Sequence, residues 1–136
     1  VAAQPRIEQR PDTFVDAARI APGLLVEARY ATAHNFVGVP IEGYDRPLCY
    51  LTRPAAEALA LVVKDLAVRG LTLKAYDCYR PERAVAHFVR WARDLRDQKM
   101  KAEFYPRVDK STLSAWAKQL KDWGFTDVDP KYLTAQ

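Results

Sequence analysis

The feature that most constrains this fold is one short apolar stretch, residues 71–76, that lies between two segments of helical periodicity. Residues 52–70 repeat apolar side chains at three- and four-residue steps, with a threonine cap, a proline in the first turn and a glycine at the end. Residues 81–95 show similar spacing and also begin with a proline. This order predicts a strand held between two helices.

A second strand is predicted at residues 24–30, where apolar and polar side chains partly alternate. Two strands separated by a helix favour an α+β fold, a small sheet with helices packed on one side. A chain of 136 residues is enough to bury one core, so we expect a single domain.

Both ends of the chain are predicted to extend this unit. Residues 1–23, which include three prolines, predict an extended arm around a short helical piece near residues 13–18. A last amphipathic helix is predicted at residues 111–124, with a serine cap and a glycine stop. We therefore expect residues 24–113 to form the main part of the domain, and residues 114–136 to form a C-terminal helix and tail.

The charge and hydropathy patterns argue against two classes of protein. The 21 Lys and Arg residues are scattered among 17 Asp and Glu for a net charge of +4, and a basic stripe with interleaved aromatic residues is missing. The longest apolar runs, around residues 58–63, fall far short of the roughly 20 residues that a bilayer requires. We therefore predict neither nucleic-acid binding nor a membrane span.

The two cysteines, Cys49 and Cys78, leave two interpretations open. An even count is compatible with a disulfide formed in an oxidising compartment, and two buried thiols are the alternative. The chain opens Val-Ala-Ala-Gln without a methionine, as a processed chain does. We expect a periplasmic or exported protein, with a cytoplasmic location as the alternative.

Arg80 is the first candidate for a functional residue. It follows the predicted strand and precedes Pro81, so we expect its guanidinium to project from the end of the sheet. A permanently charged, five-donor group there can hold a carboxylate or stabilise a developing oxyanion. The alternative is a structural arginine that bridges loop carbonyls or an acid such as Asp77.

Three motifs in the sequence resemble one known family. They are A-R-Y-A-T-A-H-N-F-V-G-V-P-I-E-G-Y at residues 28–44, Y-D-C-Y-R-P-E-R-A-V-A-H-F-V-R-W-A at residues 76–92 and F-Y-P-R-V-D-K at residues 104–110. Their types, order and spacing resemble those of the zinc D-alanyl-D-alanine dipeptidases, relatives of the carboxypeptidases that trim cell-wall peptides. The resemblance covers about residues 24–113 and implies the N-terminal half of that fold.

The resemblance also implies roles for particular residues. Arg80 matches the arginine that stabilises the tetrahedral intermediate beside the metal in those enzymes. The loop that holds Asn35, Phe36 and Tyr44 matches a wall of the dipeptide pocket. Asp77 and Tyr79, on either side of Cys78 in the arginine motif, are further ligand-binding candidates by the same resemblance.

The sequence departs from the family after Leu113. The family continues with S-x-H-x-x-G-x-x-x-D and then E-x-x-H, which supply the zinc ligands and the general base, whereas this chain continues S-A-W-A-K-Q-L-K-D-W-G-F. The only two histidines, His34 and His87, stand at positions that the family does not use for zinc. We therefore expect no metal ligands and no cofactor in this chain, although the family uses zinc.

Three functions are compatible with this pattern. The one we favour is a degenerate dipeptidase-like domain that acts as a non-catalytic binding or accessory subunit, because the predicted last helix is coherently capped and carries two tryptophans. The alternatives are an incomplete part of an active zinc dipeptidase and a structural subunit of a larger assembly. The expected partners are a D-Ala-D-Ala-type peptide or a protein that docks on the last helix.

Overall fold

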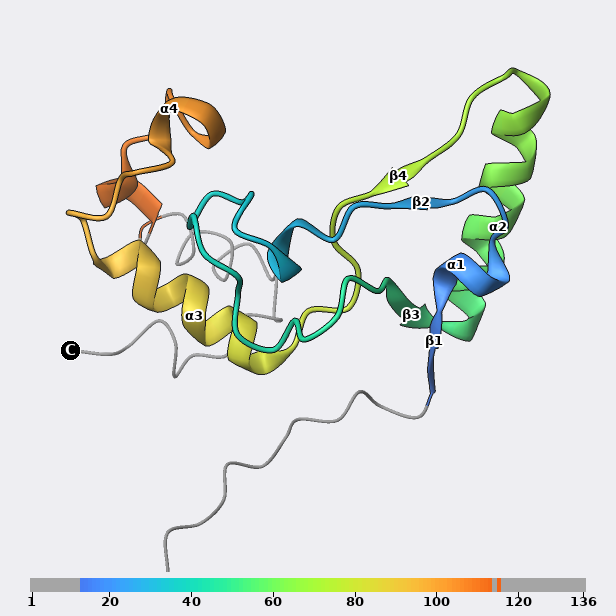
Figure 1. The fold of residues 1–136 in the computed structure, drawn as a ribbon, viewed down its shortest axis with the longest axis horizontal. Helices are drawn as coiled ribbons and strands as arrows, with labels where there is room; N and C mark the ends of the chain where they lie inside the picture. The colour runs from blue at the N-terminus through green and yellow to red at the C-terminus, as the bar shows by residue number, and fades with distance from the viewer. Residues whose placement is uncertain (1–12, 114, 116–136) are drawn as a thin grey trace, which may run out of the picture.

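The computed structural model describes residues 13–113 and residue 115, and these residues form an α+β arrangement (Figure 1). The predicted fold class is therefore confirmed. In chain order the elements are β1 (Phe14–Asp16), α1 (Ala17–Ile20), β2 (Leu25–Val26), the 3-10 turn η1 (Arg29–Ala31), β3 (Tyr50–Thr52), α2 (Arg53–Val68), β4 (Lys74–Ala75), α3 (Glu82–Arg93), α4 (Lys101–Phe104) and the 3-10 turn η2 (Lys110–Thr112).

The strands pair as two short ladders. β2 and β4, which lie within the two predicted strands, run parallel with Leu25 opposite Lys74, and α2 precedes β4 in the connection between them. β1 and β3 form a separate antiparallel pair in which Asp16 lies opposite Tyr50. The regular strands are shorter than the sequence predicts, since β2 covers two residues of the predicted strand 24–30 and β4 covers two residues of the predicted strand 71–76.

The part of the predicted N-terminal arm that the structure describes, residues 13–23, differs from the prediction of a helical piece near residues 13–18. Residues 14–16 form β1, and α1 begins only at Ala17, where the Asp16 side chain accepts a hydrogen bond from the Ala18 N–H at 3.1 Å. Ala17 and Ala21 are fully buried, so this segment belongs to the core. The partner of β1 lies more than thirty residues further along the chain, and a local sequence pattern carries no record of such a pairing.

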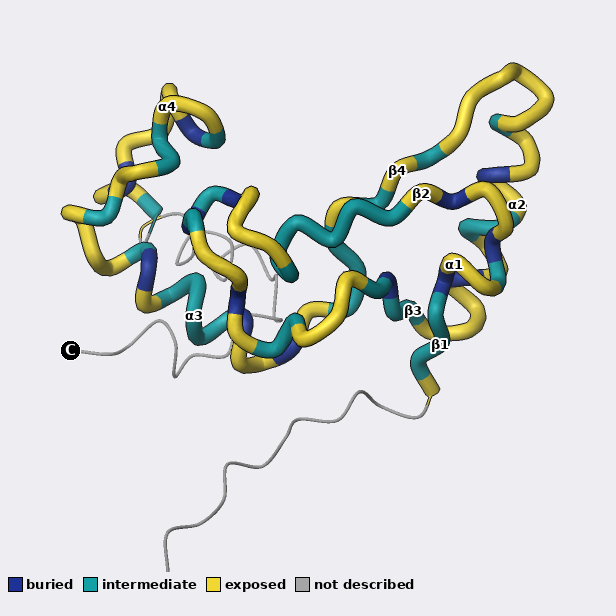
Figure 2. The backbone as a smooth tube through the Cα atoms, viewed as in Figure 1, coloured by how far each residue is buried: buried dark blue, intermediate teal, exposed yellow. Residues whose placement is uncertain are grey.

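Two hydrophobic clusters lie at opposite ends of the described molecule (Figure 2). The first joins α1 and α2 and is built on Ala17, Ala21, Leu24, Cys49, Ala56 and Val63. The second joins α3 to the loop between η1 and β3 and to the segment after α3, and is built on Val37, Ile41, Ala84, Trp91 and Tyr105. Cys78 packs against the first cluster and Ala84 belongs to the second, so residues 78–84 connect the two.

The long helices begin and end close to the predicted positions. α2 starts at Arg53 beside the predicted proline and stops before Gly70, which has a positive φ of 70°. α3 begins directly after Pro81. One cap differs, because Asp109 caps the turn η2 by accepting hydrogen bonds from the N–H and the hydroxyl of Ser111, which was the predicted cap. Most of the predicted last helix lies outside the described residues.

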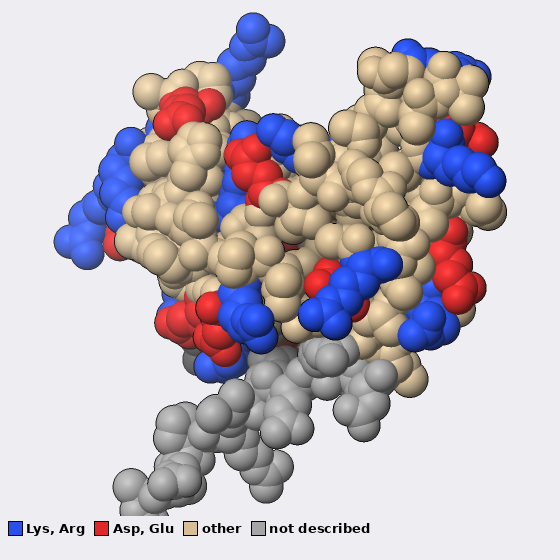
Figure 3. All heavy atoms as spheres, turned by 45° about the vertical axis from the view of Figure 1, so that its right-hand side comes forward, with Lys and Arg blue, Asp and Glu red and all other residues tan. Residues whose placement is uncertain are grey.

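Within the described residues, every helix lacks the length or the apolar content that crossing a bilayer requires. Figure 3 shows basic and acidic side chains interspersed over one face of the molecule, with apolar and neutral surface between them. On this face, positive charge does not gather into one continuous stripe.

Candidate functional site

The centre of the candidate site is an ion pair between Arg80 and Asp77. Arg80 donates from Nε at 3.1 Å and from Nη2 at 2.6 Å, and both hydrogen bonds end on Asp77 Oδ2. Both residues lie in the segment that leaves β4 and enters α3, which is the place that the sequence predicts for Arg80. The alternative interpretation, an arginine that bridges to Asp77, is thus part of the observed geometry.

Asp77 uses both of its oxygens. Oδ1 accepts from the Tyr44 hydroxyl at 2.8 Å and from the Cys78 backbone N–H at 3.0 Å, while Oδ2 accepts the two Arg80 bonds. A carboxylate has about four acceptor positions, so these partners occupy its capacity. Asp77 therefore orients Arg80 and Tyr44, and its carboxylate is not available as a metal ligand in this arrangement.

Aromatic rings surround the guanidinium of Arg80. Its Cζ atom lies 5.0 Å from the centroid of the Phe88 ring and 5.5 Å from that of Tyr30. Tyr30 in turn packs on Phe36 and Tyr44, with centroids 5.9 Å and 5.5 Å apart. Cation–π contacts of this kind hold the guanidinium plane in place. Tyr30 and Phe88 are site residues that the sequence analysis missed, although both stand inside the quoted motifs.

The pKa values of Tyr30, Tyr44 and Arg80 are all raised above their ordinary values. Burial, and then the negative charge and hydrogen bond of Asp77, raise the pKa of Tyr44 far above its ordinary value. Burial is also the main cause of the raised pKa of Tyr30. Burial alone would lower the pKa of Arg80, but the hydrogen bonds and charge of Asp77 outweigh it and the net shift is upward. The tyrosines thus remain neutral donors and Arg80 remains a cation.

A disulfide joins Cys49 to Cys78, which confirms the first of the two interpretations of these cysteines and excludes two buried thiols. It links the residue next to Asp77 with the residue before β3. The Tyr79 N–H also donates to the Tyr50 carbonyl at 2.8 Å, so two bonds anchor this segment to β3. The segment that carries Arg80 is therefore fixed against the first cluster.

Asn35 organises the loop that carries Phe36 and Tyr44. The residue is almost fully buried, and its amide donates to the Thr32 and Val39 carbonyls at 2.7 and 2.8 Å. Its carbonyl accepts from the N–H groups of the two residues that follow Phe36, at 2.8 and 3.0 Å. Its polar atoms serve the loop backbone, so it shapes the predicted wall, while a direct contact with a ligand stays a prediction.

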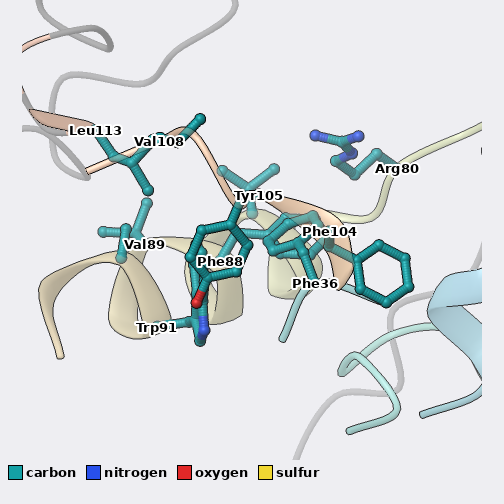
Figure 4. Close-up of a pocket in the computed structure, with 11 residues that line it drawn as sticks. Phe36, Arg80, Phe88, Val89, Trp91, Phe104, Tyr105, Val108 and Leu113 are labelled. Carbon is teal, nitrogen blue, oxygen red and sulfur yellow. The ribbon is translucent and has the colours of Figure 1, made fainter. Parts of the chain in front are cut away.

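Two cavities flank the Arg80 group. A smaller one of about 170 Å³ is lined by Asn35, Phe36, Asp77 and neighbouring residues. A larger one of about 430 Å³ has Arg80 and Phe36 in its wall together with apolar residues of α3 (Figure 4). Four of the predicted residues, Arg80, Asp77, Tyr44 and Phe36, thus lie close together. Tyr79 instead packs its ring on Phe14 of β1, with centroids 4.8 Å apart.

The described residues do not fit a zinc ion. His34 Nε2 lies 2.6 Å from Glu103 Oε1, whereas His87 Nδ1 accepts from the Glu42 backbone N–H at 3.1 Å. Across residues 13–113 and 115, no group of three or more His, Cys, Asp or Glu side chains lies close enough together to hold a metal ion. The two imidazoles have different acidic or backbone partners and are not drawn into a common site.

Comparison with known proteins relates this chain to one family of peptidases. The model of one protein family, described as D-ala-D-ala dipeptidase, matches residues 10–122. A D-alanyl-D-alanine dipeptidase of Enterococcus faecium is 36% identical over 101 residues, which cover 74% of this chain and 49% of that protein. One of Streptomyces coelicolor is 34% identical over 100 residues, covering 74% and 48% of the two chains.

A third relative, the D-alanyl-D-alanine dipeptidase of Escherichia coli, is 42% identical over 73 residues, covering 54% of this chain and 37% of that protein. The chain thus spans about half the length, or less, of the relatives it matches. From the family match over most of its residues, we conclude that the chain belongs to the D-alanyl-D-alanine dipeptidase family.

Proposed function

We propose that this chain is a binding domain for D-Ala-D-Ala-type peptides that does not hydrolyse them by itself. Arg80 is the residue that recognises the peptide, by donating to its terminal carboxylate or to a peptide carbonyl. Tyr44 and Phe36 form the adjacent wall, and Asn35 shapes it. In this proposal Asp77 is a positioning residue for Arg80.

The observation that carries the proposal is how Arg80 is held. Its two bonds to Asp77 use Nε and Nη2, so the five-donor guanidinium retains N–H groups that can meet an acceptor from the cavity side. The ion pair has no net charge, so attraction at long range is weak and recognition depends on direct hydrogen bonds. We therefore expect weak binding, with a Kd on the order of millimolar.

Calorimetry with D-Ala-D-Ala tests this function. We expect heat of binding with the parent chain, a loss of about tenfold or more in affinity with Arg80→Ala, and no change with Arg96→Ala. Arg96 is the matched control because its side chain is 96% exposed and forms only a loose pair with Asp94 at 3.6 Å. Equal isotherms from the parent and Arg80→Ala would exclude the binding function.

An incomplete zinc dipeptidase is the second candidate. It is supported by the coverage, since the relatives that carry the dipeptidase name are about twice as long as the matched region. Metal analysis and an assay of D-Ala release, each with and without a chelator, decide between the two candidates when they are made on the protein isolated from its source, because a fragment of the enzyme and a non-catalytic domain would both be inactive. Stoichiometric zinc with chelator-sensitive release would replace the non-catalytic proposal, whereas release at the level of the buffer supports it.

We further propose that the protein is exported, as a periplasmic or extracellular domain. The Cys49–Cys78 disulfide supports this location, because such bonds form and persist mainly in oxidising compartments. Alkylation of thiols in intact cells, followed by mass measurement, tests it. Two alkylated cysteines in the native protein would favour the cytoplasmic alternative.

A further inference from the structure

A second arginine, Arg29, lies in the wall of the smaller cavity of about 170 Å³. The rings of Tyr76 and Phe104 line the same cavity, and the Cζ atom of Arg29 lies 4.1 Å from the centroid of the first ring and 6.0 Å from that of the second. Cation–π contacts of this kind restrain a guanidinium. The two rings therefore hold Arg29 at the wall of the cavity.

Arg29 has more hydrogen-bond donors than its partners use. Its Nε atom donates to Glu27 Oε1 at 3.1 Å, whereas its two Nη nitrogens form no hydrogen bond with any residue that the structure describes. Both Nη nitrogens keep accessible surface, unlike the unpaired buried atoms of Trp91 and Tyr105. A guanidinium with unpaired N–H groups in its fixed fork matches the two oxygens of a carboxylate.

The charges around Arg29 also favour an anion. Glu27 accepts from Arg29 and, through Oε2, from Lys74 Nζ at 3.0 Å, so one carboxylate pairs with two cations and the group keeps one net positive charge. The hydrogen bonds from Lys74 and then from Arg29 lower the pKa of Glu27, which keeps this carboxylate ionised. Arg80 and Asp77 form a neutral pair. The excess positive charge therefore lies beside Arg29.

The smaller cavity adjoins the group around Arg80. Phe36 and Phe104 line both cavities, and the Asp77 carboxylate that holds Arg80 lies in the wall of the smaller one. The Cζ atom of Arg80 is 5.5 Å from the ring centroid of Tyr30, which also lines the smaller cavity. An extended dipeptide spans about 7 Å, so it is long enough to enter the smaller cavity and still meet Arg80.

From this geometry we propose that Arg29 binds the terminal carboxylate of the peptide in the smaller cavity, and that Arg80 donates to a peptide carbonyl. This inference rests on the proposed function and names the group that each arginine recognises. The ligand class is a short peptide with a free, charged C-terminus. The cavity is smaller than the roughly 300–1,000 Å³ of sites for larger organic ligands, so it admits only a small C-terminal side chain such as that of alanine.

Titration of the full chain with D-Ala-D-Ala and with its C-terminal amide, followed by NMR chemical shifts, tests this assignment. The parent chain is expected to bind the acid about tenfold more tightly than the amide, because the amide lacks the charge that Arg29 pairs with. Arg29→Gln should weaken binding of the acid about tenfold and leave binding of the amide unchanged. Arg80→Ala should weaken binding of both peptides by a similar factor, because both contain the carbonyl that it contacts.

Lys74→Gln is the matched control. It removes the same charge from the same group, but Lys74 lies outside the lining of the smaller cavity. We expect it to change the affinity for the acid by no more than about twofold, because salt screens a charge that does not touch the ligand. Equal losses of affinity in Lys74→Gln and Arg29→Gln would exclude a direct contact with Arg29 and overturn the inference.

The outcomes separate this inference from the proposed function. A preference for the acid that Arg29→Gln abolishes and Arg80→Ala keeps supports the inference. The opposite pattern, or equal binding of acid and amide by the parent chain, overturns the inference and leaves the proposed function standing. No binding of either peptide by the parent chain excludes both. Thermal melts show which variants are folded, and the preference in Arg80→Ala decides the point even where Arg29→Gln does not fold.

Discussion

Tyr44 illustrates how one hydroxyl group contributes to both the stability and the geometry of the site. It donates to Asp77 Oδ1 at 2.8 Å, on the side of the carboxylate that Arg80 does not use. Burial and the charge of Asp77 raise the pKa of Tyr44, so the folded protein keeps its proton at pH values where a free tyrosine loses it. The phenol therefore acts as a donor and not as a base.

This upward shift predicts a specific loss of stability in alkali. Above about pH 10 the unfolded chain releases the Tyr44 proton while the folded chain retains it, so the unfolded state binds fewer protons and stability falls as pH rises. Between about pH 8 and pH 11 the contribution is at most about 1.4 kcal/mol, and solvent screening reduces it. We expect Tyr44→Phe to lose less stability than the parent over this interval, measured by urea denaturation.

Tyr76→Phe is the control for this experiment, because Tyr76 is 46% exposed and lies under the Arg29 guanidinium, whereas the hydroxyl that donates to Asp77 is that of Tyr44. The free energy of unfolding of Tyr76→Phe should decrease by the same amount as that of the parent between the two pH values. If the free energy of unfolding decreases equally in Tyr44→Phe and in the parent between the two pH values, the titration of Tyr44 does not cause the loss of stability in alkali.

At the scale of elements, the sequence predicts the parts that depend on local pattern. The two proline-opened helices and the place of Arg80 after a strand follow from spacing and turn chemistry, and they are observed. The antiparallel pair of β1 and β3 and the fourfold acceptor role of Asp77 were not predictable, because they depend on residues that meet only in three dimensions. The resemblance to a family supplied Arg80 and Tyr44 as neighbours, which spacing alone does not.

The loop between η1 and β3 depends on one glycine. Gly43 has a φ of 93°, and a Cβ atom there would lie 3.0 Å from Cβ of Pro81, whose ring cannot move aside easily. Gly70 has a φ of 70° and open space around its own Cβ position. We expect Gly70→Ala to cost about 1 kcal/mol from backbone strain and Gly43→Ala at least about twice as much, because overpacking adds to strain. Chemical denaturation of both variants measures the difference, and equal losses would show that the contact with Pro81 relaxes freely.

At the scale of the whole molecule, the Cys49–Cys78 disulfide is a covalent cross-link at the start of residues 78–84, the segment that connects the two hydrophobic clusters. It ties Cys49, which is buried in the first cluster, to the segment that continues through Arg80 into α3 and the second cluster. The organisation of the chain as a single domain, which the sequence predicts, would require the two clusters to unfold together. We propose one cooperative transition, with the disulfide as a main constraint on it.

Replacing both cysteines, as Cys49→Ala with Cys78→Ala, tests this constraint. The bond closes a loop with a sequence separation of 29 residues, and the chain-entropy relation predicts a loss of about 3–4 kcal/mol when it is removed. We expect a correspondingly lower urea midpoint in a single transition, and a matching decrease when the parent is unfolded in the presence of a reductant. Two separate transitions in the parent would show that the clusters unfold independently, and a loss below about 1 kcal/mol would show that hydrogen bonds such as that from the Tyr79 N–H to the Tyr50 carbonyl hold the segment without the disulfide.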